Sequence, residues 1–457
     1  MNKKFRDFLF FFFVFVFIFG TIVLSLYASG YKFNLSWPLE FNRLLVKTGM
    51  IALDSDPRGA VIYLDGKAQP SAAWRPWQKK YLSTPAKIKN VVPGEYEIIV
   101  ERPGYWPFKT TLRVNSGLTT FYEDINLFKS DNPTIKAIGD DSSSEETINL
   151  SPNGNYLYLN GSAKIINLNK DNEERDVLVD YENLVSTSSP SLNASWQKNN
   201  ELLINGIFFS PNNLSNDRNF LSLVGPNAYD WKFEENSNRL FYKTQNNLSY
   251  IELGQKQATL VLNDLLIGDY LPRNKSFFLI VPGDDQTLVR EYSYEQRIFT
   301  QELSLPSDGE YLFGEEKNDY LSIYDKKNKI LYILEKNYLN KGFKKIESVK
   351  DWQWNSNEGI FFISDWELQY FNLKEGRFDL LARLGINLES LLINERNKYL
   401  LLSSNQEVVV YDLRTSYMTT ILKAEKISSP ALDPGKDLLY FWSKLEDQQG
   451  VYRISVK

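Results

Sequence analysis

The sequence predicts an all-β protein carried by one apolar N-terminal helix. Three observations support this fold class. An uncharged run of twenty residues follows a short basic N-terminus, short alternating strands and turns fill the next stretch, and a unit of about forty residues then recurs to the C-terminus. The aromatic content of 14% favours strands, and no long segment beyond the N-terminal run has helical periodicity.

The composition excludes several kinds of chemistry. The 457 residues include no His and no Cys, which rules out Ser-His-Asp triads, thiol nucleophiles, disulfides and Cys-ligated metals. The net charge of −5 offers no basic field for nucleic acid. We therefore expect no enzyme activity, no cofactor and no metal site, although carboxylates, Lys, Tyr and Ser remain available for catalysis.

Residues 1–7 form the expected cytoplasmic tail, and residues 8–28 form the expected transmembrane anchor. The tail carries Lys3, Lys4 and Arg6, and the run after it is long enough to cross the hydrocarbon core of a bilayer. The positive-inside rule then leaves the bulk of the chain extracytoplasmic. A cleaved signal peptide, with "YASG" as its small-residue site, is the alternative. Residues 29–48 are expected to be a juxtamembrane linker.

Residues 49–128 predict a small β-sandwich of about six strands, because short apolar strands alternate there with strong turn signals. In "SDPRGAVIYLDG" a proline turn and an Asp-Gly hairpin turn flank one strand. Later "PGEYEIIVE" and "RPGY" repeat the pattern, with Tyr96, Ile98 and Val100 on the inward face. The residues expected to have structural roles in these turns are Pro57, Gly59, Asp65, Gly66, Pro93, Gly94 and Gly104.

These motifs, in this order, resemble those of a PEGA domain, a small β-module of bacterial surface proteins. Pro57, Gly59 and Ala60 match its namesake tetrapeptide, and Arg58 departs from the usual Glu. The resemblance implies a structural or interaction module without catalytic residues.

One loop departs from the PEGA pattern by its length. Between the Asp-Gly turn and Thr84-Pro85, residues 67–83 read "KAQPSAAWRPWQKKYLS". Interleaved aromatic and basic side chains suit a glycan, an anionic polymer or a lipid headgroup surface. The alternative is that the two Trp side chains pack back over the sandwich. The candidate binding residues are Trp74, Arg75, Trp77, Lys79, Lys80 and Tyr81.

Residues 148–457 predict a β-propeller of seven or eight blades, with eight favoured. Each unit has an apolar anchor, a polar turn and a strongly apolar strand, at the spacing of four-stranded blades. The region resembles WD-repeat-like and TolB-like propellers, most clearly in "SPNGNYLYL" at residues 151–159, although the Trp-Asp signature is not evident.

Residues 129–147 are expected to be a linker that also closes the propeller. The last unit ends after about three strands, so "TIKAI" within residues 128–139 should supply the missing outer strand. Trp196, Trp231, Trp352 and Trp354 precede the polar turn of their units, which favours packing between blades. Trp366 and Trp442 fall later in their units.

The function expected from the sequence is that of a bacterial, single-pass membrane protein that binds at the cell surface. Its partner would be an envelope protein, a cell-wall polymer or a glycan. Two other hypotheses stay open: a carboxylate-based lyase or glycosidase, and an envelope-assembly scaffold. Acidic turns such as "GDDS" and "GDDQ" lack the spacing of a calcium loop.

Overall fold

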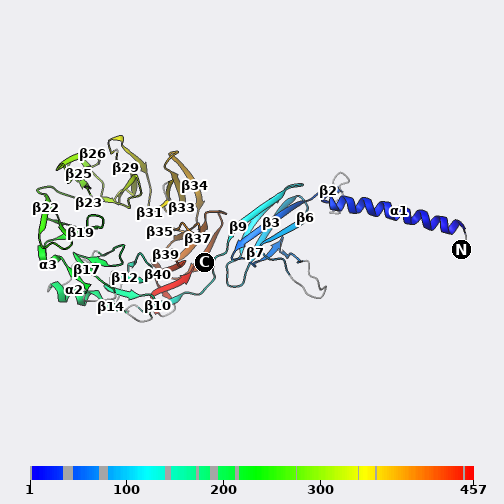
Figure 1. Ribbon diagram of the computed structural model, residues 1–457, viewed down its shortest axis with the longest axis horizontal. Coiled ribbons are helices and arrows are strands. Elements are labelled where there is room, and N and C mark those ends of the chain that lie inside the picture. The colour runs from blue at the N-terminus through cyan, green and yellow to red at the C-terminus, as the bar shows by residue number, and fades with distance from the viewer. Residues whose placement is uncertain are drawn as a thin grey trace. The chain divides into compact units, whose positions relative to one another are not determined.

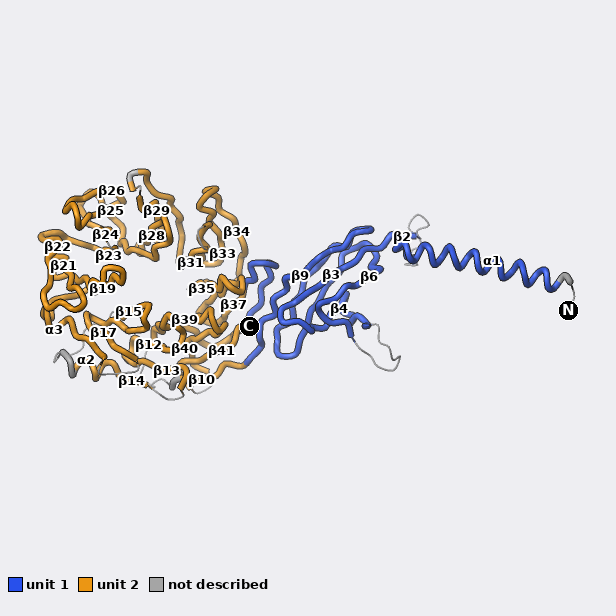
Figure 2. Tube along the Cα trace, viewed as in Figure 1, with its two compact units in different colours: residues 1–131, 411–421, 457 blue, residues 132–410, 422–456 orange. Residues whose placement is uncertain are grey.

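The computed structural model describes residues 3–33, 45–71, 81–138, 146–170, 174–185, 194–211, 216–273, 275–337, 339–355, 358–445 and 448–457. These residues form one long helix and many short strands (Figure 1). The chain divides into two compact units (Figure 2): unit 1 holds residues 1–131, 411–421 and 457, and unit 2 holds residues 132–410 and 422–456.

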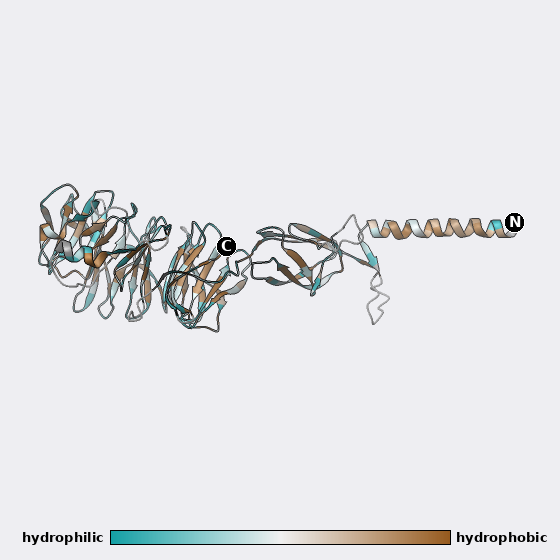
Figure 3. Cartoon of the chain, turned by 90° about the horizontal axis from the view of Figure 1, so that it is seen from below, coloured by the Kyte–Doolittle hydropathy of each residue, from teal (hydrophilic) through white to brown (hydrophobic). Residues whose placement is uncertain are grey.

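Helix α1 (Lys3–Ala28) is the element that the uncharged run predicts. Its stretch Phe5–Ala28 is long and apolar enough to cross a membrane, judged by length and composition. Brown, apolar residues follow one another along most of this helix in Figure 3. Its Thr21 hydroxyl donates to the carbonyl oxygen of Phe17 at 2.8 Å, so this polar side chain is satisfied within the helix. A helix that is apolar on every face suits lipid better than water.

A two-stranded ribbon and a β-sandwich complete most of unit 1. The ribbon pairs β1 (Tyr31–Phe33) with β2 (Leu45–Lys47), where the sequence predicts only a linker. The sandwich has one sheet in the order β6-β3-β9 and a second in the order β5-β4-β7-β8. Their bounds are β3 (Gly49–Asp56), β4 (Val61–Leu64), β5 (Lys67–Ala68), β6 (Ala86–Val91), β7 (Gly94–Glu101), β8 (Phe108–Val114) and β9 (Thr119–Asn126).

The two sheets of the sandwich enclose one apolar core. Ile51, Ile62, Ile98 and Val100 are fully buried in it. The alternation predicted for β7 is therefore confirmed for Ile98 and Val100. Tyr96 is half-buried, and its hydroxyl donates to the carbonyl oxygen of Val92 at 2.7 Å.

The Asp-Gly turn of the sandwich has the predicted hairpin conformation. Asp65 and Gly66 have φ of 47° and 72°, as a type I′ turn between β4 and β5 requires. Gly104 lies in the turn between β7 and β8, where the amide of Tyr105 donates to the carbonyl oxygen of Arg102 at 3.1 Å.

Two other predicted turns are built differently. The amide of Gly59, which follows Pro57, donates to the carbonyl oxygen of Thr84 at 2.8 Å and ties this turn to the segment before β6. Pro93 and Gly94 lie where the chain passes from one sheet to the other, so they make no hairpin. Near the end of β6, just before this connection, Asn90 has a positive φ of 57°.

The remaining described residues form eight four-stranded sheets, which succeed one another around a ring in Figure 1 and are numbered here as blades. Blades 1 to 4 consist of β11 (Ile148–Leu150), β12 (Tyr156–Leu159), β13 (Lys164–Asn167) and β14 (Glu174–Asp176); β15 (Ala194–Trp196), β16 (Leu202–Ile204), β17 (Ile207–Phe209) and β18 (Arg218–Asn219); β19 (Tyr229–Glu234), β20 (Arg239–Thr244), β21 (Asn247–Glu252) and β22 (Ala258–Leu262); and β23 (Asp269–Pro272), β24 (Ser276–Val281), β25 (Gln286–Ser293) and β26 (Ile298–Pro306).

Blades 5 to 8 continue the same pattern. They consist of β27 (Tyr311–Phe313), β28 (Tyr320–Asp325), β29 (Ile330–Glu335) and β30 (Phe343–Ile346); β31 (Asp351–Asn355), β32 (Gly359–Ile363), β33 (Glu367–Asn372) and β34 (Arg377–Arg383); β35 (Ser390–Asn394), β36 (Tyr399–Ser403), β37 (Glu407–Asp412) and β38 (Met418–Lys423); and β39 (Ile427–Asp433), β40 (Leu438–Leu445) and β41 (Gln448–Ser455) with β10 (Thr134–Ile138). Helices α2 (Val177–Val185) and α3 (Leu221–Val224) and a 3-10 turn (Leu339–Lys341) lie between strands. The sequence does not predict them.

The second strand of each blade is buried along most of its length. In β32 and β36 every residue is buried, and β24 is buried from Phe277 to Val281. A blade has neighbours on both faces, so its central strands carry apolar side chains on both faces. This explains the continuous apolar runs that the sequence repeats.

Strand β10 closes the ring as the sequence predicts. It pairs antiparallel with β41, from Thr134 opposite Arg453 to Ile138 opposite Gly450. The eighth sheet therefore has the order β10-β41-β40-β39 and joins the start of the repeat region to its end.

The Trp side chains that precede the polar turns pack between blades, as expected. The indole N–H of Trp196 in blade 2 donates to the carbonyl oxygen of Asn149 in blade 1 at 2.9 Å. Trp354 in blade 6 donates to the carbonyl oxygen of Glu315, beside β27 of blade 5, at 3.2 Å. Trp231 and Trp442 are also buried. Trp366 is the exception, because 62% of it is exposed.

Candidate functional site

Most of the binding loop proposed from the sequence lies outside the described residues. This holds for Trp74, Arg75, Trp77, Lys79 and Lys80. Tyr81, the last of that set, is half exposed and forms an isolated antiparallel bridge with Pro70. The structure therefore places only Tyr81.

Trp366 lines a recess of about 720 Å³ at one end of blade 6. This volume lies within the range of about 300–1,000 Å³ that is usual for ligand sites. Apart from Trp366, the walls are polar except for Leu384 and Gly385. The residues of this Trp366 recess are Glu347, Ser348, Ser364, Asp365, Trp366, Glu367, Gln369, Arg383, Leu384 and Gly385.

Three connections of the propeller form the Trp366 recess. Trp366 lies in the turn between β32 and β33, Glu347 and Ser348 lie between β30 and β31, and Gly385 follows β34. Successive connections of an up-and-down blade alternate between its two ends. These three connections therefore meet at the same end of the strands.

Backbone hydrogen bonds hold the Trp366 turn in place. The amide of Leu384 donates to the carbonyl oxygen of Trp366 at 2.8 Å, and the amide of Leu388 donates to that of Asp365 at 2.7 Å. The amide of Ser364 closes the turn onto Glu367 at 3.0 Å. The exposed indole is thus presented by a fixed turn, so ordering it on binding costs little entropy.

Each carboxylate of the recess is paired with a cation. Asp365 pairs with Lys350 at 2.7 Å, Glu347 with Lys345 at 2.7 Å, and Glu367 with Arg383 at 2.9 Å. The hydrogen bond and charge of the partner Lys lower the pKa of Asp365 and Glu347, so both stay ionised at neutral pH. The recess therefore has many hydrogen-bonding groups and nearly balanced charge.

This arrangement suits a neutral ligand with an apolar face and many hydroxyl groups. An exposed indole offers a flat surface for stacking. Around it the carboxylates accept hydrogen bonds, Arg383 donates them, and the Gln369 amide, which donates to Glu367 at 2.8 Å, has both functions.

A second recess, of about 530 Å³, lies between blades 3 and 4. It includes Arg239, Lys275 and Arg297 together with Tyr250 and Tyr294. The guanidinium of Arg239 lies 4.7 Å from the Tyr250 ring centre and pairs with Glu252 at 3.1 Å. Its other wall includes the turn between β25 and β26, a connection at the opposite end of the strands from that of Trp366. Its more basic lining gives it a different chemistry.

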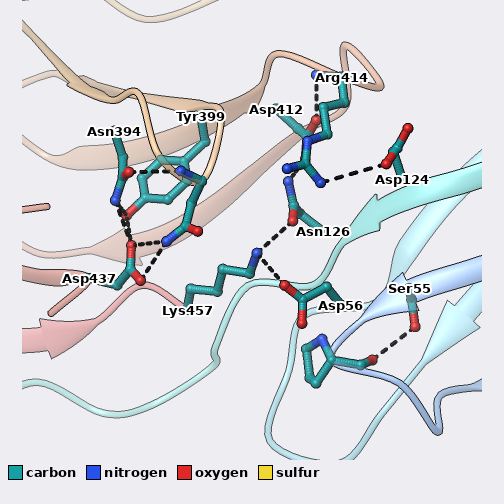
Figure 4. Close-up of polar contacts among 12 residues, drawn as sticks. Ser55, Asp56, Asp124, Asn126, Asn394, Tyr399, Asp412, Arg414, Asp437 and Lys457 are labelled. Atoms are coloured by element: carbon teal, nitrogen blue, oxygen red, sulfur yellow. Dashed lines mark hydrogen bonds and ion pairs between the residues drawn. The ribbon is translucent and has the colours of Figure 1, made fainter. Parts of the chain in front are cut away.

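Two polar networks, shown in Figure 4, have structural roles. In unit 2, Asp437 accepts hydrogen bonds from Asn394, Asn397 and the hydroxyl of Tyr399, and so joins blade 7 to blade 8. In unit 1, Asn126 donates to Asp412 at 2.6 Å and accepts from Lys457 at 2.7 Å. This second network joins three parts of the chain that are far apart in the sequence.

The sequence held one signal for the Trp366 recess. Trp366 falls after the apolar strand of its unit, out of phase with Trp196, Trp231 and Trp354, although Trp442 also falls late in its unit and is buried. The surrounding polar groups come from three connections, and their proximity depends on how neighbouring blades pack. The phase of a Trp in its unit therefore marks an unusual position without showing that the indole is exposed, and the sequence could not assemble the recess.

The fold and these recesses define a β-propeller preceded by a sandwich and an apolar helix. Residues 48–127 match the family model of the PEGA domain, which agrees with the sandwich formed by β3 to β9. A comparison with curated proteins gave no match.

Several solved structures resemble the chain at low identity. Hsv2 of Kluyveromyces lactis is 10% identical with a TM-score of 0.34, and the match covers 47% of this chain and 71% of Hsv2. A chain of the mitotic checkpoint complex is 9% identical with a TM-score of 0.40, covering 72% of this chain and 93% of that one. The AfRom2 CNH domain is 9% identical with a TM-score of 0.36, covering 70% and 98%. The propeller assignment rests on the eight sheets. A PEGA domain and a propeller together suggest a binding or interaction role.

Proposed function

We propose that this chain is a membrane-anchored bacterial surface protein that binds a neutral carbohydrate of the cell envelope in the Trp366 recess. In this proposal α1 stays attached and crosses the membrane, with the N-terminus in the cytoplasm and the two units outside. Lys3, Lys4 and Arg6 ahead of the apolar run support this orientation. The intact mass of the membrane-bound protein tests the anchor, because a cleaved signal peptide would remove it.

The observation that carries the proposal is the exposed Trp366 in a recess of balanced charge. Ligand sites are typically concave and combine aromatic side chains with a few polar groups, as this recess does. A charged partner would favour an excess of one sign, whereas here each acid has its own cation. A carbohydrate presents apolar ring faces and hydroxyl groups, and both features match this lining.

The inserted loop of the sandwich is proposed as a second contact with envelope polymer, on its sequence alone. Its aromatic and basic residues at positions 74–81 suit an anionic or glycan surface. We also propose that the chain is not an enzyme and binds no nucleic acid. The lack of His and Cys and the net charge of −5 support both statements.

Co-sedimentation of the detergent-solubilised full chain with insoluble cell-wall polysaccharide tests the carbohydrate site. We expect Trp366→Ala to weaken binding at least about ten-fold, the size of a central aromatic contact. Trp106→Ala is the matched control, because Trp106 is 38% exposed and lies in unit 1. Equal binding by the wild type and Trp366→Ala would exclude the recess as the site.

A further inference from the structure

The end of the sandwich that joins α1 carries the features of a lipid-binding surface. Hydrogen bonds connect it directly to the helix end. The Asn90 side chain donates to the hydroxyl of Tyr27 at 3.1 Å, and the amide and hydroxyl of Thr48 both donate to the carbonyl oxygen of Gly30 at 2.7 Å. All of these residues belong to unit 1.

The turn between β8 and β9 is held at the same end. The amide of Gly117 donates to the carbonyl oxygen of Thr48 at 3.0 Å, and the hydroxyl of Ser116 donates to that of Lys47 at 3.0 Å. The next residue, Leu118, is 60% exposed, and Leu45 of β2 is 40% exposed. Two exposed leucines thus lie on the segments that these hydrogen bonds connect to the end of α1.

Cations surround these leucines. Lys32, Lys47, Lys89 and Arg113 are all exposed here, and none forms an ion pair with another described residue. Among the described residues, the acid Glu95 lies opposite Arg113 in the register of β7 and β8. We call this surface, made of Lys32, Lys47, Lys89, Arg113, Leu45 and Leu118, the basic end of the sandwich.

At the opposite end of the sandwich, acids and cations are paired with each other. Strands β3 and β9 run parallel, with Met50 opposite Thr119 at the basic end and Asp56 opposite Asn126 at the other. That far end has a recess lined by Asp54, Asp56, Glu123 and Asp124 together with Arg58 and Arg414. Asp54 pairs with Arg58, Asp56 with Lys457 and Asp124 with Arg414, whereas the cations at the basic end have no acid partner among the described residues.

We propose that the basic end docks onto the headgroup layer of an anionic bilayer, with Leu118 and Leu45 reaching its apolar boundary. This inference rests on α1 spanning the membrane. Tyr27 would then lie at the interface, where Tyr is enriched, and the groups bonded to Tyr27 and Gly30 would lie within the few ångströms of the headgroup layer. Clustered cations beside exposed apolar side chains are the combination that binds anionic lipid surfaces.

Because the chain has no Cys, one introduced Cys can carry a single fluorescent label in the full chain, which is studied in lipid nanodiscs. The Leu118→Cys variant carries an environment-sensitive fluorophore, and Glu123→Cys places the same label farther along β9 as the control. The discs contain phosphatidylcholine alone or with phosphatidylglycerol, plus a lipid that carries a nitroxide quencher. We expect several-fold stronger quenching at position 118 than at 123 in the anionic discs.

A charge-reversal variant tests the electrostatic part. Lys47→Glu, Lys89→Glu and Arg113→Glu together should reduce quenching at position 118 to the level at 123, and an unchanged thermal transition should show that the fold persists. Equal quenching at 118 and 123 in anionic discs overturns the proposal. The proposal is also overturned if quenching at position 118 is the same in neutral and anionic discs and is unchanged by the three substitutions. If α1 does not span the membrane, a different result is expected: alkaline washing would release the chain from membranes.

Discussion

Asp437 is the residue on which the junction of blades 7 and 8 most depends. Its carboxylate accepts from Asn394 at 2.6 Å, from Asn397 at 2.6 Å and from the hydroxyl of the fully buried Tyr399 at 2.8 Å. We expect Asp437→Ala to lower the free energy of unfolding by roughly 2–4 kcal/mol, because three donor side chains lose their carboxylate acceptor. Thermal unfolding measures this. Asp285→Ala, at an exposed hairpin position, is the control, and equal losses in both variants would contradict the account.

Asp351 at the start of β31 makes stability depend on pH. Its carboxylate accepts from the amides of Trp352 and Leu391 at 2.8 Å, and burial raises its pKa to about 6. A raised pKa means that the folded state binds the proton more tightly. The contribution of Asp351 to stability therefore falls as pH rises from about 4 to about 6.

Asp351→Asn cannot titrate, so its stability should decline less over that interval. We expect the difference between wild type and variant to change by roughly 1–3 kcal/mol between pH 4 and pH 7. Denaturant unfolding at a series of pH values measures it. Only the slope is compared, so a constant offset from altered hydrogen bonding does not affect the test. Parallel pH profiles would show that Asp351 does not titrate differently on folding.

At the scale of single residues, the Trp side chains show which contacts could be predicted from the sequence. Trp196 and Trp354 repeat in phase with their units, and both pack between blades as predicted. Trp366 and Trp442 both break that phase, yet Trp366 is exposed and Trp442 is buried. The position of each Trp within its unit could be seen in the sequence, but the residues around Trp366 could not be predicted. Glu347 and Arg383 come from other parts of the chain, and their positions depend on tertiary packing.

At the scale of elements, strand β10 is the closure of the propeller. A fragment of residues 132–457 keeps β10, and a fragment of residues 139–457 lacks it and leaves β41 as an open edge. We expect the longer fragment to melt cooperatively at the higher temperature and the shorter one to melt several degrees lower or to aggregate. Calorimetry and light scattering on the pair compare them directly. Matching transitions would mean that β10 does not close the ring.

Elements with continuous apolar runs or strong turns were predictable, and the short ones were not. The second strand of each blade and the Asp65-Gly66 hairpin carry their signal locally. Strand β5 has only two residues, and β1 and β2 pair over three residues each. Whether such short segments form strands depends on their tertiary contacts, which the local sequence does not show. Pro93-Gly94 carries a turn signal, yet the chain there crosses between sheets because β6 and β7 pair with different partners.

For the whole molecule, the site proposed in the propeller would recognise hydroxyl groups and ring faces rather than charge. Binding of a neutral carbohydrate in the Trp366 recess should therefore change little with salt. We expect less than about a three-fold change in affinity between low and high ionic strength, because the site's charges are already paired with each other. A ligand whose affinity fell steeply with salt would indicate an anionic partner at another surface, such as the recess that contains Arg239 and Lys275.

The most direct test of the central claim is a calorimetric titration of the full chain in nanodiscs with soluble oligosaccharides from the bacterial cell wall. For neutral oligosaccharides we expect saturable binding that is at least about ten-fold weaker in Trp366→Ala and unchanged in Trp106→Ala. Saturable binding of the same affinity in the wild type and in Trp366→Ala would contradict it.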